Sequence, residues 1–381
     1  MEEVHESDRD ELDGWPALSR REFLVRGAAV MLLPGLAAAL LSACGGSGTN
    51  EAAPGSRFAG TAVLQGTLGG VAHAELSAFH EQFPRAQIVA QPYYPTLAAD
   101  ERALLTNDRG AYDFAFGDLA LMDEIKAAGF AATLSRQTIP NLRFVDEAYR
   151  RLCPFAVPND YSVSVIAYRK DLVGESPATW SDFWRLAVKH SGRVAIADDE
   201  RATIGTTLKS LGLSANATDA PALQRVAQAL VELKPHLWDR RARPGQKIVS
   251  DLDEGTVVLA QCSNHIAAAA KRANAQVASI IPSDGTCADM NCFVPLRGAA
   301  HPEIVAAFLN FHLEPSTYAQ FVNARATSWV ESPAAPYLAS VVRASAALRP
   351  TPAQLARAEW ARYLGAGQTL WDLVWQQFND A

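Results

Sequence analysis

The chain has 381 residues, of which 49% are hydrophobic and 20% are charged, and its formal net charge is −7. Eight acids and four arginines precede residue 44, so more than half of the excess negative charge lies at the N-terminal end and the body is nearly neutral. A nearly neutral body has no basic field that gathers phosphates, so no nucleic acid is expected as a partner. The length suits a globular protein of two lobes.

The N-terminal segment predicts export. Arg20 and Arg21, followed closely by Phe-Leu, resemble the recognition motif of the twin-arginine export route. The uncharged stretch 27–43 ends in Leu-Ser-Ala before Cys44, which resembles a lipobox whose cysteine is diacylated and becomes the mature N-terminus. We therefore predict a signal peptide at 1–43, a Gly/Ser tether at 44–56, and a lipoprotein at the extracytoplasmic face of the membrane, in the periplasm or at the cell surface. The alternative is an N-terminal transmembrane anchor, because the apolar stretch is borderline in length for spanning a bilayer.

From about residue 57 onward, short apolar runs alternate with helical patterns. The segment after the first run places Leu76, Phe79 and Phe83 on one helical face, and a further helix is expected at 97–105. This alternation predicts βα units with a mainly parallel sheet, and because the rhythm recurs later in the chain it predicts two α/β lobes. The expected strands are 61–64, 88–90, 112–116, 163–168, 194–197, 257–259 and 277–281.

The C-terminal tail is expected to be helical. Thr351 and Pro352 form a typical cap and first-turn pair, which predicts that the tail helix starts there. Four apolar residues follow at helical spacing, and we interpret them as core rather than as a ligand cage: Trp371, Val374, Trp375 and Phe378.

Residues that directly follow the strands are the first candidates for a site. In open α/β sheets, ligands lie outside the carboxyl ends of the strands. The candidates chosen by this rule are Thr67 to Gly70, Tyr93, Tyr94, Asp118, Asp198, Asp199, Ser263, Asn264 and the predicted loop 284–292.

Four stretches of the body resemble the spermidine/putrescine-binding family of solute-binding proteins. They are Ala-Tyr-Asp at 111–113, Thr-Trp-Ser-Asp-Phe-Trp at 179–184, Asp198-Asp199 with Leu-Gly-Leu-Ser at 211–214 and Thr218-Asp219, and Phe-Leu-Asn-Phe to Pro at 308–315. The resemblance covers nearly all of residues 57–381. It implies the type 2 periplasmic-binding-protein fold, in which two lobes, each a mainly parallel sheet flanked by helices, close on a small ligand. It also implies a monomer without a cofactor that docks on a permease of an ABC importer, formed by separate chains.

The resemblance also suggests where the lobes divide. Residues 57–162 with 291–338 are expected to form lobe 1, and residues 166–287 with 342–381 lobe 2. The crossings would lie near 163–165 and Asn291. Asp160 and Tyr161 precede the first crossing, where they are either hinge residues that face the cleft or ordinary loop residues.

The ligand positions of the family carry over only in part. By position, Asp199 keeps one family carboxylate, whereas Ala202 stands in place of a glutamate and Asp118 in place of a serine. The loop that starts at Thr67 lacks the family's Trp-Thr-Glu-Tyr character. Ser263 and Asp289 stand where the family has tryptophans, and Asn291 stands where it has another aspartate.

Three carboxylates predict the chemistry of the ligand. Asp118, Asp199 and Asp289 would converge on one cleft, and an organic ammonium group would relieve their mutual repulsion. Tyr94 would add an aromatic face for the cation, whereas Thr67 would open a helix whose N–H groups favour an anionic group. A cationic or zwitterionic amine is therefore the expected ligand, with a neutral or metal ligand as the alternative. Asp118 and Asp199 would otherwise only cap helices. The predicted ligand-binding set is Thr67, Tyr94, Asp118, Asp199, Ser263, Asp289 and Asn291.

Four cysteines besides Cys44 leave three further interpretations open. An even count in an exported protein favours disulfides, and Cys287 and Cys292 are the expected pair because they lie in one predicted loop. Cys153 with Cys262 stays open. A zinc site that also uses His265 is an alternative without a familiar spacing. The third is an enzyme on the same fold, with a cleft cysteine as nucleophile.

Overall fold

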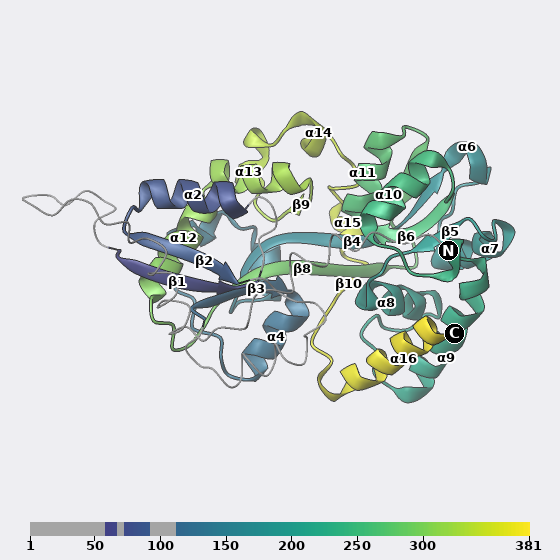
Figure 1. Cartoon of the computed structure of the whole chain (residues 1–381), viewed down its shortest axis with the longest axis horizontal. Helices are drawn as coiled ribbons and strands as arrows, with labels where there is room; N and C mark the ends of the chain where they lie inside the picture. The colour runs from purple at the N-terminus through teal and green to yellow at the C-terminus, as the bar shows by residue number, and fades with distance from the viewer. Residues whose placement is uncertain (1–57, 67–71, 92–111) are drawn as a thin grey trace, which may run out of the picture.

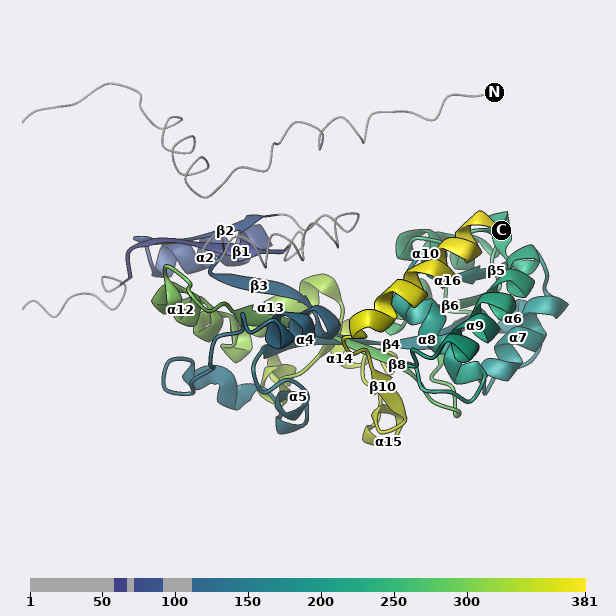
Figure 2. The same cartoon turned by 90° about the horizontal axis from the view of Figure 1, so that it is seen from below.

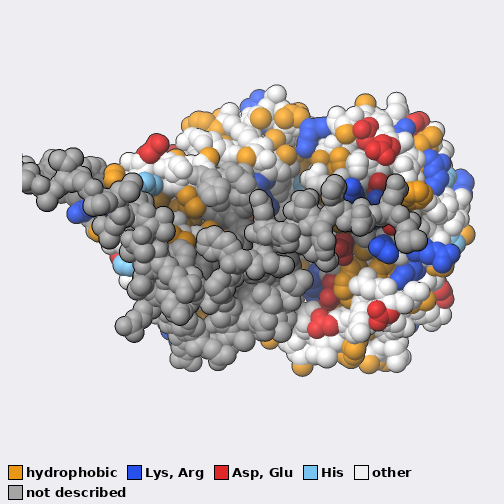
Figure 3. Space-filling view, viewed as in Figure 1, with side chains coloured by type: hydrophobic (Ala, Val, Ile, Leu, Met, Phe, Trp, Pro, Cys, Tyr) orange, Lys and Arg blue, Asp and Glu red, His pale blue; other side chains and the backbone are white. Residues whose placement is uncertain are grey.

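The computed structural model describes residues 58–66, 72–91 and 112–381. Two lobes lie side by side along the long axis of the molecule, and two long strands join them (Figures 1 and 2). No helix in the described residues combines the length and the apolar character that crossing a bilayer requires. On the visible face of the second lobe, acidic and basic side chains are interspersed, as the nearly neutral body predicts (Figure 3).

The first lobe is built on three parallel strands. β1 (Gly60–Gln65) lies between β2 (Ala86–Gln91) and β3 (Phe114–Asp118), as the sequence predicts. A parallel pair needs a crossover between its strands, and α2 (Ala72–Gln82) supplies the one between β1 and β2. The other helices of this lobe are α4 (Leu119–Ala127), α5 (Glu147–Leu152), α12 (Pro302–His312), α13 (Pro315–Arg325) and α14 (Ser340–Arg343).

Two long strands cross between the lobes. β4 (Val157–Arg169) runs antiparallel to β8 (Thr286–Pro295), and β4 then continues into the second lobe beside β6 (Leu259–Ser263) and β7 (Val277–Ile280). One sheet therefore runs through both lobes in the order β2-β1-β3-β8-β4-β6-β5. The crossing strands make this sheet mixed, whereas β1 to β3 and the pair of β5 and β6 are parallel as predicted.

The predicted loop 284–292 is wrong, because most of it is strand β8. Its Asp and Asn residues are typical of loops. In the structure, however, β8 lies between β3 and β4, and both edges of its backbone are paired. Tertiary pairing therefore overrides a weak local strand propensity. The strand expected at 257–259 is also wrong in its bounds, because the structure has it at β6, Leu259–Ser263.

The second lobe surrounds β5 (Val194–Ile196) and β6 with helices. Helix α7 (Trp180–Lys189) begins at a full capping box, in which Thr179 and Asp182 satisfy each other's backbone N–H groups. The other helices are α6 (Lys170–Val173), α8 (Glu200–Ser210), α9 (Ala220–Leu233), α10 (Gly245–Glu254), α11 (Asn264–Ala273) and α16 (Gln368–Asp380). Five short 3-10 segments complete the described chain: Pro140–Phe144, Lys234–His236, Trp238–Arg240, Ser332–Tyr337 and Gly365–Gly367.

The tail is not one continuous helix. Thr351 does cap a helix, but α15 (Pro352–Leu355) lasts only one turn. β10 (Ala358–Trp360) then pairs with β8, and a second short strand, β9 (Ser328–Trp329), pairs with β4. The apolar residues of α16 do belong to the core: Trp371, Val374 and Phe378 are buried, and α16 packs on α9.

Glu331 is a buried acid of the first lobe. It is 0% exposed, and neither of its carboxylate oxygens has a hydrogen-bond partner in the part of the chain that the structure describes. Burial, with the charges of Asp146 and Glu314, raises its pKa to about 9. The folded protein therefore keeps a proton that the unfolded chain loses above its ordinary pKa of 4.5. The free energy of unfolding should fall as the pH rises from about 4.5 to 9, by at most about 1.4 kcal/mol per pH unit for this group.

Urea unfolding between pH 5 and 8 checks this expectation. Glu331→Gln cannot titrate, so its free energy of unfolding should depend less steeply on pH than that of the wild type. Glu254→Gln, at the exposed C-terminal end of α10, is the matched control and should keep the wild-type slope. Equal slopes for Glu331→Gln and the wild type would contradict the assignment.

Candidate functional site

A cavity of about 420 Å³ lies where the two lobes meet. Side chains at the ends of three strands line it: Asp118 ends β3, Asp199 follows β5, and Ser263 ends β6. Asp289 of β8 and Ser164 of β4 line it from the crossing strands. The location follows the rule for carboxyl ends of strands, and the size falls within the range of about 300–1,000 Å³ usual for small-molecule sites.

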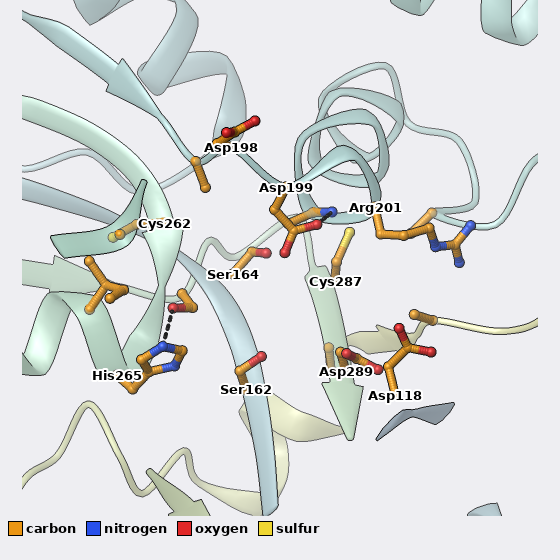
Figure 4. A pocket seen from close by; sticks show the side chains of 18 of the residues that line it. Asp118, Ser162, Ser164, Asp198, Asp199, Arg201, Cys262, His265, Cys287 and Asp289 are labelled. Carbon is orange, nitrogen blue, oxygen red and sulfur yellow. Dashed lines mark hydrogen bonds between the residues drawn. The ribbon is translucent and has the colours of Figure 1, made fainter. Parts of the chain in front are cut away.

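Three of the predicted ligand residues are carboxylates in this cavity. Figure 4 shows Asp118 and Asp289 at one side and Asp199 across from them. One oxygen of Asp118 accepts from the Leu121 N–H at 2.8 Å and caps α4. One oxygen of Asp199 likewise accepts from the Ala202 N–H at 2.9 Å and caps α8. The capping interpretation is therefore correct for both residues, and both also line the cavity.

Asp289 is the carboxyl that the cavity perturbs most clearly. Burial, and then the charge of Asp118, raise its pKa to about 8. Burial also raises the pKa of Asp199, to which Asp118 again adds. An empty cavity therefore holds Asp289 mostly protonated at neutral pH, and a cation beside it would favour the ionised form. Among the described residues, no group of three or more His, Cys, Asp or Glu side chains is arranged to hold a metal ion.

Arg201 is a lining residue that the sequence reasoning missed. Its Nη2 atom donates to Asn216 Oδ1 at 2.8 Å and to the Arg362 carbonyl oxygen at 3.2 Å. The guanidinium carbon lies 4.3 Å from the centre of the Trp371 ring. Its Nε and Nη1 atoms are buried, and neither has a hydrogen-bond partner among the described residues. The signal for Arg201 was its place two residues after Asp199, at the start of the same helix. The predicted ligand set contains acids, hydroxyl and amide side chains and one aromatic residue, but no basic residue.

Ser263 lines the cavity together with His265. The Ser263 hydroxyl lies 3.3 Å from His265 Nε2, and burial lowers the pKa of this histidine, so the ring is neutral at pH 7. His265 Nδ1 is buried without a partner. The pair therefore offers hydroxyl and imidazole groups of adaptable polarity to a ligand.

Asn291 does not line the cavity. Its side-chain amide donates to Asp160 at 3.1 Å, on the neighbouring strand β4. Asp160 also accepts from Thr327 at 2.9 Å, and both Asp160 and Tyr161 are buried in β4 rather than part of a loop. The hydrogen bond from Asn291 therefore ties β8 to β4, and we leave this residue out of the proposed ligand set.

The predicted disulfide between Cys287 and Cys292 is wrong. Both cysteines lie on strand β8, five residues apart, so their side chains point to opposite faces and their Cα atoms are roughly 16 Å apart. A disulfide needs Cα atoms within about 7 Å. All four described cysteines are buried and free in the structure.

The cavity cysteines have poor chemistry for a nucleophile. Cys262 and Cys287 line the cavity, and burial raises the pKa of each thiol to about 12. Because the thiolate is the reactive form, neither is activated at neutral pH. His265, the histidine nearest to Cys262 in the sequence, has its hydrogen-bond contact with the Ser263 hydroxyl and not with a cysteine.

Several predicted residues lie outside the described part of the chain. These are Thr67, Tyr93, Tyr94, the expected helix 97–105, the arginine pair Arg20 and Arg21, and Cys44.

A two-lobed α/β fold whose crossing strands flank a cavity with carboxylates in a partly apolar wall is typical of extracellular binding proteins for small solutes. The family model for bacterial extracellular solute-binding proteins matches residues 77–337, and the chain belongs to this family. The resemblance to the spermidine/putrescine-binding proteins is thereby confirmed.

Two relatives and one solved structure illustrate the likeness. The putrescine/cadaverine-binding protein of Pseudomonas aeruginosa is 27% identical over 66% of this chain and 72% of its own length. The spermidine/putrescine-binding periplasmic protein of Escherichia coli is 24% identical over 72% of this chain and 80% of its own length. A lipoprotein of Treponema pallidum shares the fold with a TM-score of 0.68 and 23% identity, covering 84% of this chain and 99% of that one.

Proposed function

We propose that this protein captures a small organic amine, cationic or zwitterionic, outside the cytoplasm and delivers it to the permease of an ABC importer. The observation that carries this proposal is the cavity between the lobes with Asp118, Asp199 and Asp289 in its wall. The names of the relatives, which bind putrescine, cadaverine or spermidine, support the same ligand class.

Charge favours an ammonium group as the part of the ligand that is recognised. Five acids line the cavity, against a single guanidinium, so the wall favours a cation: the acids are Asp118, Asp198, Asp199, Asp289 and Glu359, and the guanidinium is that of Arg201. An ammonium group donates three hydrogen bonds, and bonds to carboxylates are roughly twice as strong as neutral ones.

The free donors of Arg201 favour an amine that also carries a carboxylate. Burying N–H groups without a partner costs free energy, and an anionic group in the cavity would remove that cost. The proposed ligand class therefore includes ω-amino acids as well as diamines.

Closure of the lobes would couple binding to transport. Asp118 belongs to the proposed lobe 1 (57–162 with 291–338) and Asp199 to the proposed lobe 2 (166–287 with 342–381). A ligand that touches both stabilises the closed form by its differential affinity for that form. β4 is continuous through residues 163–165, so the hinge we propose there bends this strand and β8 rather than a loop.

Export and anchoring complete the proposal. The twin-arginine motif would direct export, and a lipid on Cys44 would hold the protein at the membrane while the 44–56 tether lets the lobes reach the permease. An enzyme with a cleft cysteine is the weaker candidate, because the buried Cys262 and Cys287 thiols are not activated.

Thermal-shift titration of residues 45–381 tests the ligand class. Putrescine, spermidine, 4-aminobutanoate, betaine, glucose and Zn²⁺ are compared at saturating concentration. A ligand at about 100 times its Kd adds about 2.7 kcal/mol to the free energy of unfolding, which raises the melting temperature by a few degrees. We expect this rise with an amine. A rise with glucose or Zn²⁺ alone would refute the amine and leave the binding class intact.

A further inference from the structure

Two buried cysteines from distant parts of the chain face each other in the first lobe. The Sγ atoms of Cys153 and Cys292 are 3.7 Å apart, and both residues are 0% exposed. Cys153 directly follows helix α5 and stands just before β4, whereas Cys292 lies on β8 opposite Gly117 and Pro158. A disulfide bond is about 2.05 Å long, so the sulfur atoms have to approach by only about 1.6 Å, within reach of small side-chain and backbone shifts.

We propose that Cys153 and Cys292 form a disulfide bond in the exported protein. This goes beyond the solute-binding function and does not depend on which ligand the cavity takes. Disulfides form and persist in oxidising compartments, and relatives of this chain are named as periplasmic. Of the four cysteines in the body, Cys153 and Cys292 would then be bonded, and Cys262 and Cys287 would remain as thiols in the cavity wall.

The reaction is a thiol–disulfide exchange with a protein or small-molecule disulfide as oxidant. The Cys153 thiolate attacks one sulfur of the oxidant, its S–S bond breaks, and the leaving sulfur departs as a thiolate. The Cys292 thiolate then attacks Cys153 Sγ in the mixed disulfide and releases the second thiol. The two protein thiols lose two protons and two electrons in total, and the oxidant is reduced to two thiols.

Cys153 is the residue that meets the oxidant first. The helix before it, α5, has six residues and none of them is fully buried, although Tyr149 stacks on Tyr161, so this segment opens more easily than the sheet that holds Cys292. Cys292 lies inside the sheet, where burial raises the pKa of its thiol, so it reacts second, with the sulfur already beside it.

The bond would close a loop that contains the second-lobe strands β5 to β7. It would join residue 153 to residue 292, a loop of about 140 residues, and a long loop loses much conformational entropy in the unfolded chain when it is closed. Cys292 lies three residues from Asp289 on the same strand, so the two side chains point to opposite faces. The bond would therefore stabilise the crossing of β4 and β8 without entering the cavity.

Mass spectrometry of the full chain, recovered from the envelope of a bacterium that exports it, tests the proposal. The protein is alkylated with N-ethylmaleimide in denaturant, without a reductant, and then digested. We expect a peptide that links Cys153 to Cys292, with label on Cys262 and Cys287 only. After reduction with dithiothreitol, all four should carry the label. Label on Cys153 and Cys292 without reduction would overturn the proposal.

Stability gives the second readout. The oxidised wild type should melt about 5–10 °C above the same protein after reduction, and Cys292→Ser should melt like the reduced form. Cys262→Ser is the matched control, which should keep both the linked peptide and the difference between oxidised and reduced protein. If Cys292→Ser does not fold, the difference in melting temperature between the oxidised and the reduced wild type still tests whether the bond stabilises the protein. Equal melting temperatures of those two forms would refute the stabilising bond.

Discussion

Asp289→Asn should weaken the binding of an amine ligand about 100-fold at pH 8. The substitution removes the negative charge from a buried carboxyl of the cavity and leaves the volume of the side chain unchanged. The Asn oxygen can still accept from the Met290 N–H, which donates to Asp289 Oδ1 at 2.8 Å, so the strand should hold its geometry. Loss of one partner of a buried charge pair costs about 2–5 kcal/mol, and 100-fold corresponds to about 2.7 kcal/mol.

Asp289 is a better choice for this test than the other two carboxylates. Asp118 and Asp199 each cap a helix, so replacing them confounds affinity with stability. Asp198→Asn is the matched control, because Asp198 lines the cavity but Figure 4 shows its carboxylate turned away from the other three. Isothermal titration calorimetry should give a loss below about 3-fold for the control. Equal losses for the two variants would mean that the charge of Asp289 has no special role.

The same titrations at different pH values give an independent check. The free protein holds a proton on Asp289 below about pH 8, and a bound ammonium favours its release. The affinity of the wild type should therefore rise with pH toward 8, by at most tenfold per pH unit. In Asp289→Asn this dependence should become much shallower, and what remains would come from Asp199, whose pKa burial also raises. An affinity of the wild type that is flat from pH 6 to 8 would show that Asp289 does not exchange its proton on binding.

Much of the fold could be predicted because its strands carry local signals. Each of the apolar runs that became β1, β3, β5 and β7 has a helix as a neighbour along the chain, and the rule for strand ends then selected Asp118, Asp199 and Ser263 for the cavity. The acids at these ends were correctly seen as helix caps as well, because capping depends only on neighbouring residues.

The errors concern features that depend on distant parts of the chain. β8 carries Asp289 and Asn291 and resembles a loop, and only its place between β3 and β4 makes it a strand. The wrong disulfide followed directly from that error, since two cysteines in one loop can meet but two on one strand cannot. The proximity of Cys153 to Cys292 depends on pairing across 139 positions, for which the sequence has no local signal.

Arg201→Gln should change which amine the protein prefers. Putrescine and 4-aminobutanoate both have four carbon atoms, and a terminal CH2–NH3+ group of putrescine is a carboxylate group in 4-aminobutanoate. The free Nε and Nη1 donors of Arg201 would serve the carboxylate, whereas its charge opposes a second ammonium. We expect the variant to bind 4-aminobutanoate about 30–100-fold more weakly, in line with about 2–3 kcal/mol for a charge-assisted contact. Its affinity for putrescine should stay the same or rise.

The ratio of the two affinities separates recognition from structural support. Arg201 also stacks on Trp371 and bonds Asn216, so the variant will lose some stability, and that loss would weaken both ligands alike. Arg201→Lys keeps the charge without the planar fork and should show an intermediate preference. Arg225→Gln, on an exposed position of α9, controls for the change in net charge and should leave the ratio as it is. A ratio that is equal in the wild type and Arg201→Gln would mean that Arg201 holds the wall of the cavity and takes no part in choosing the ligand.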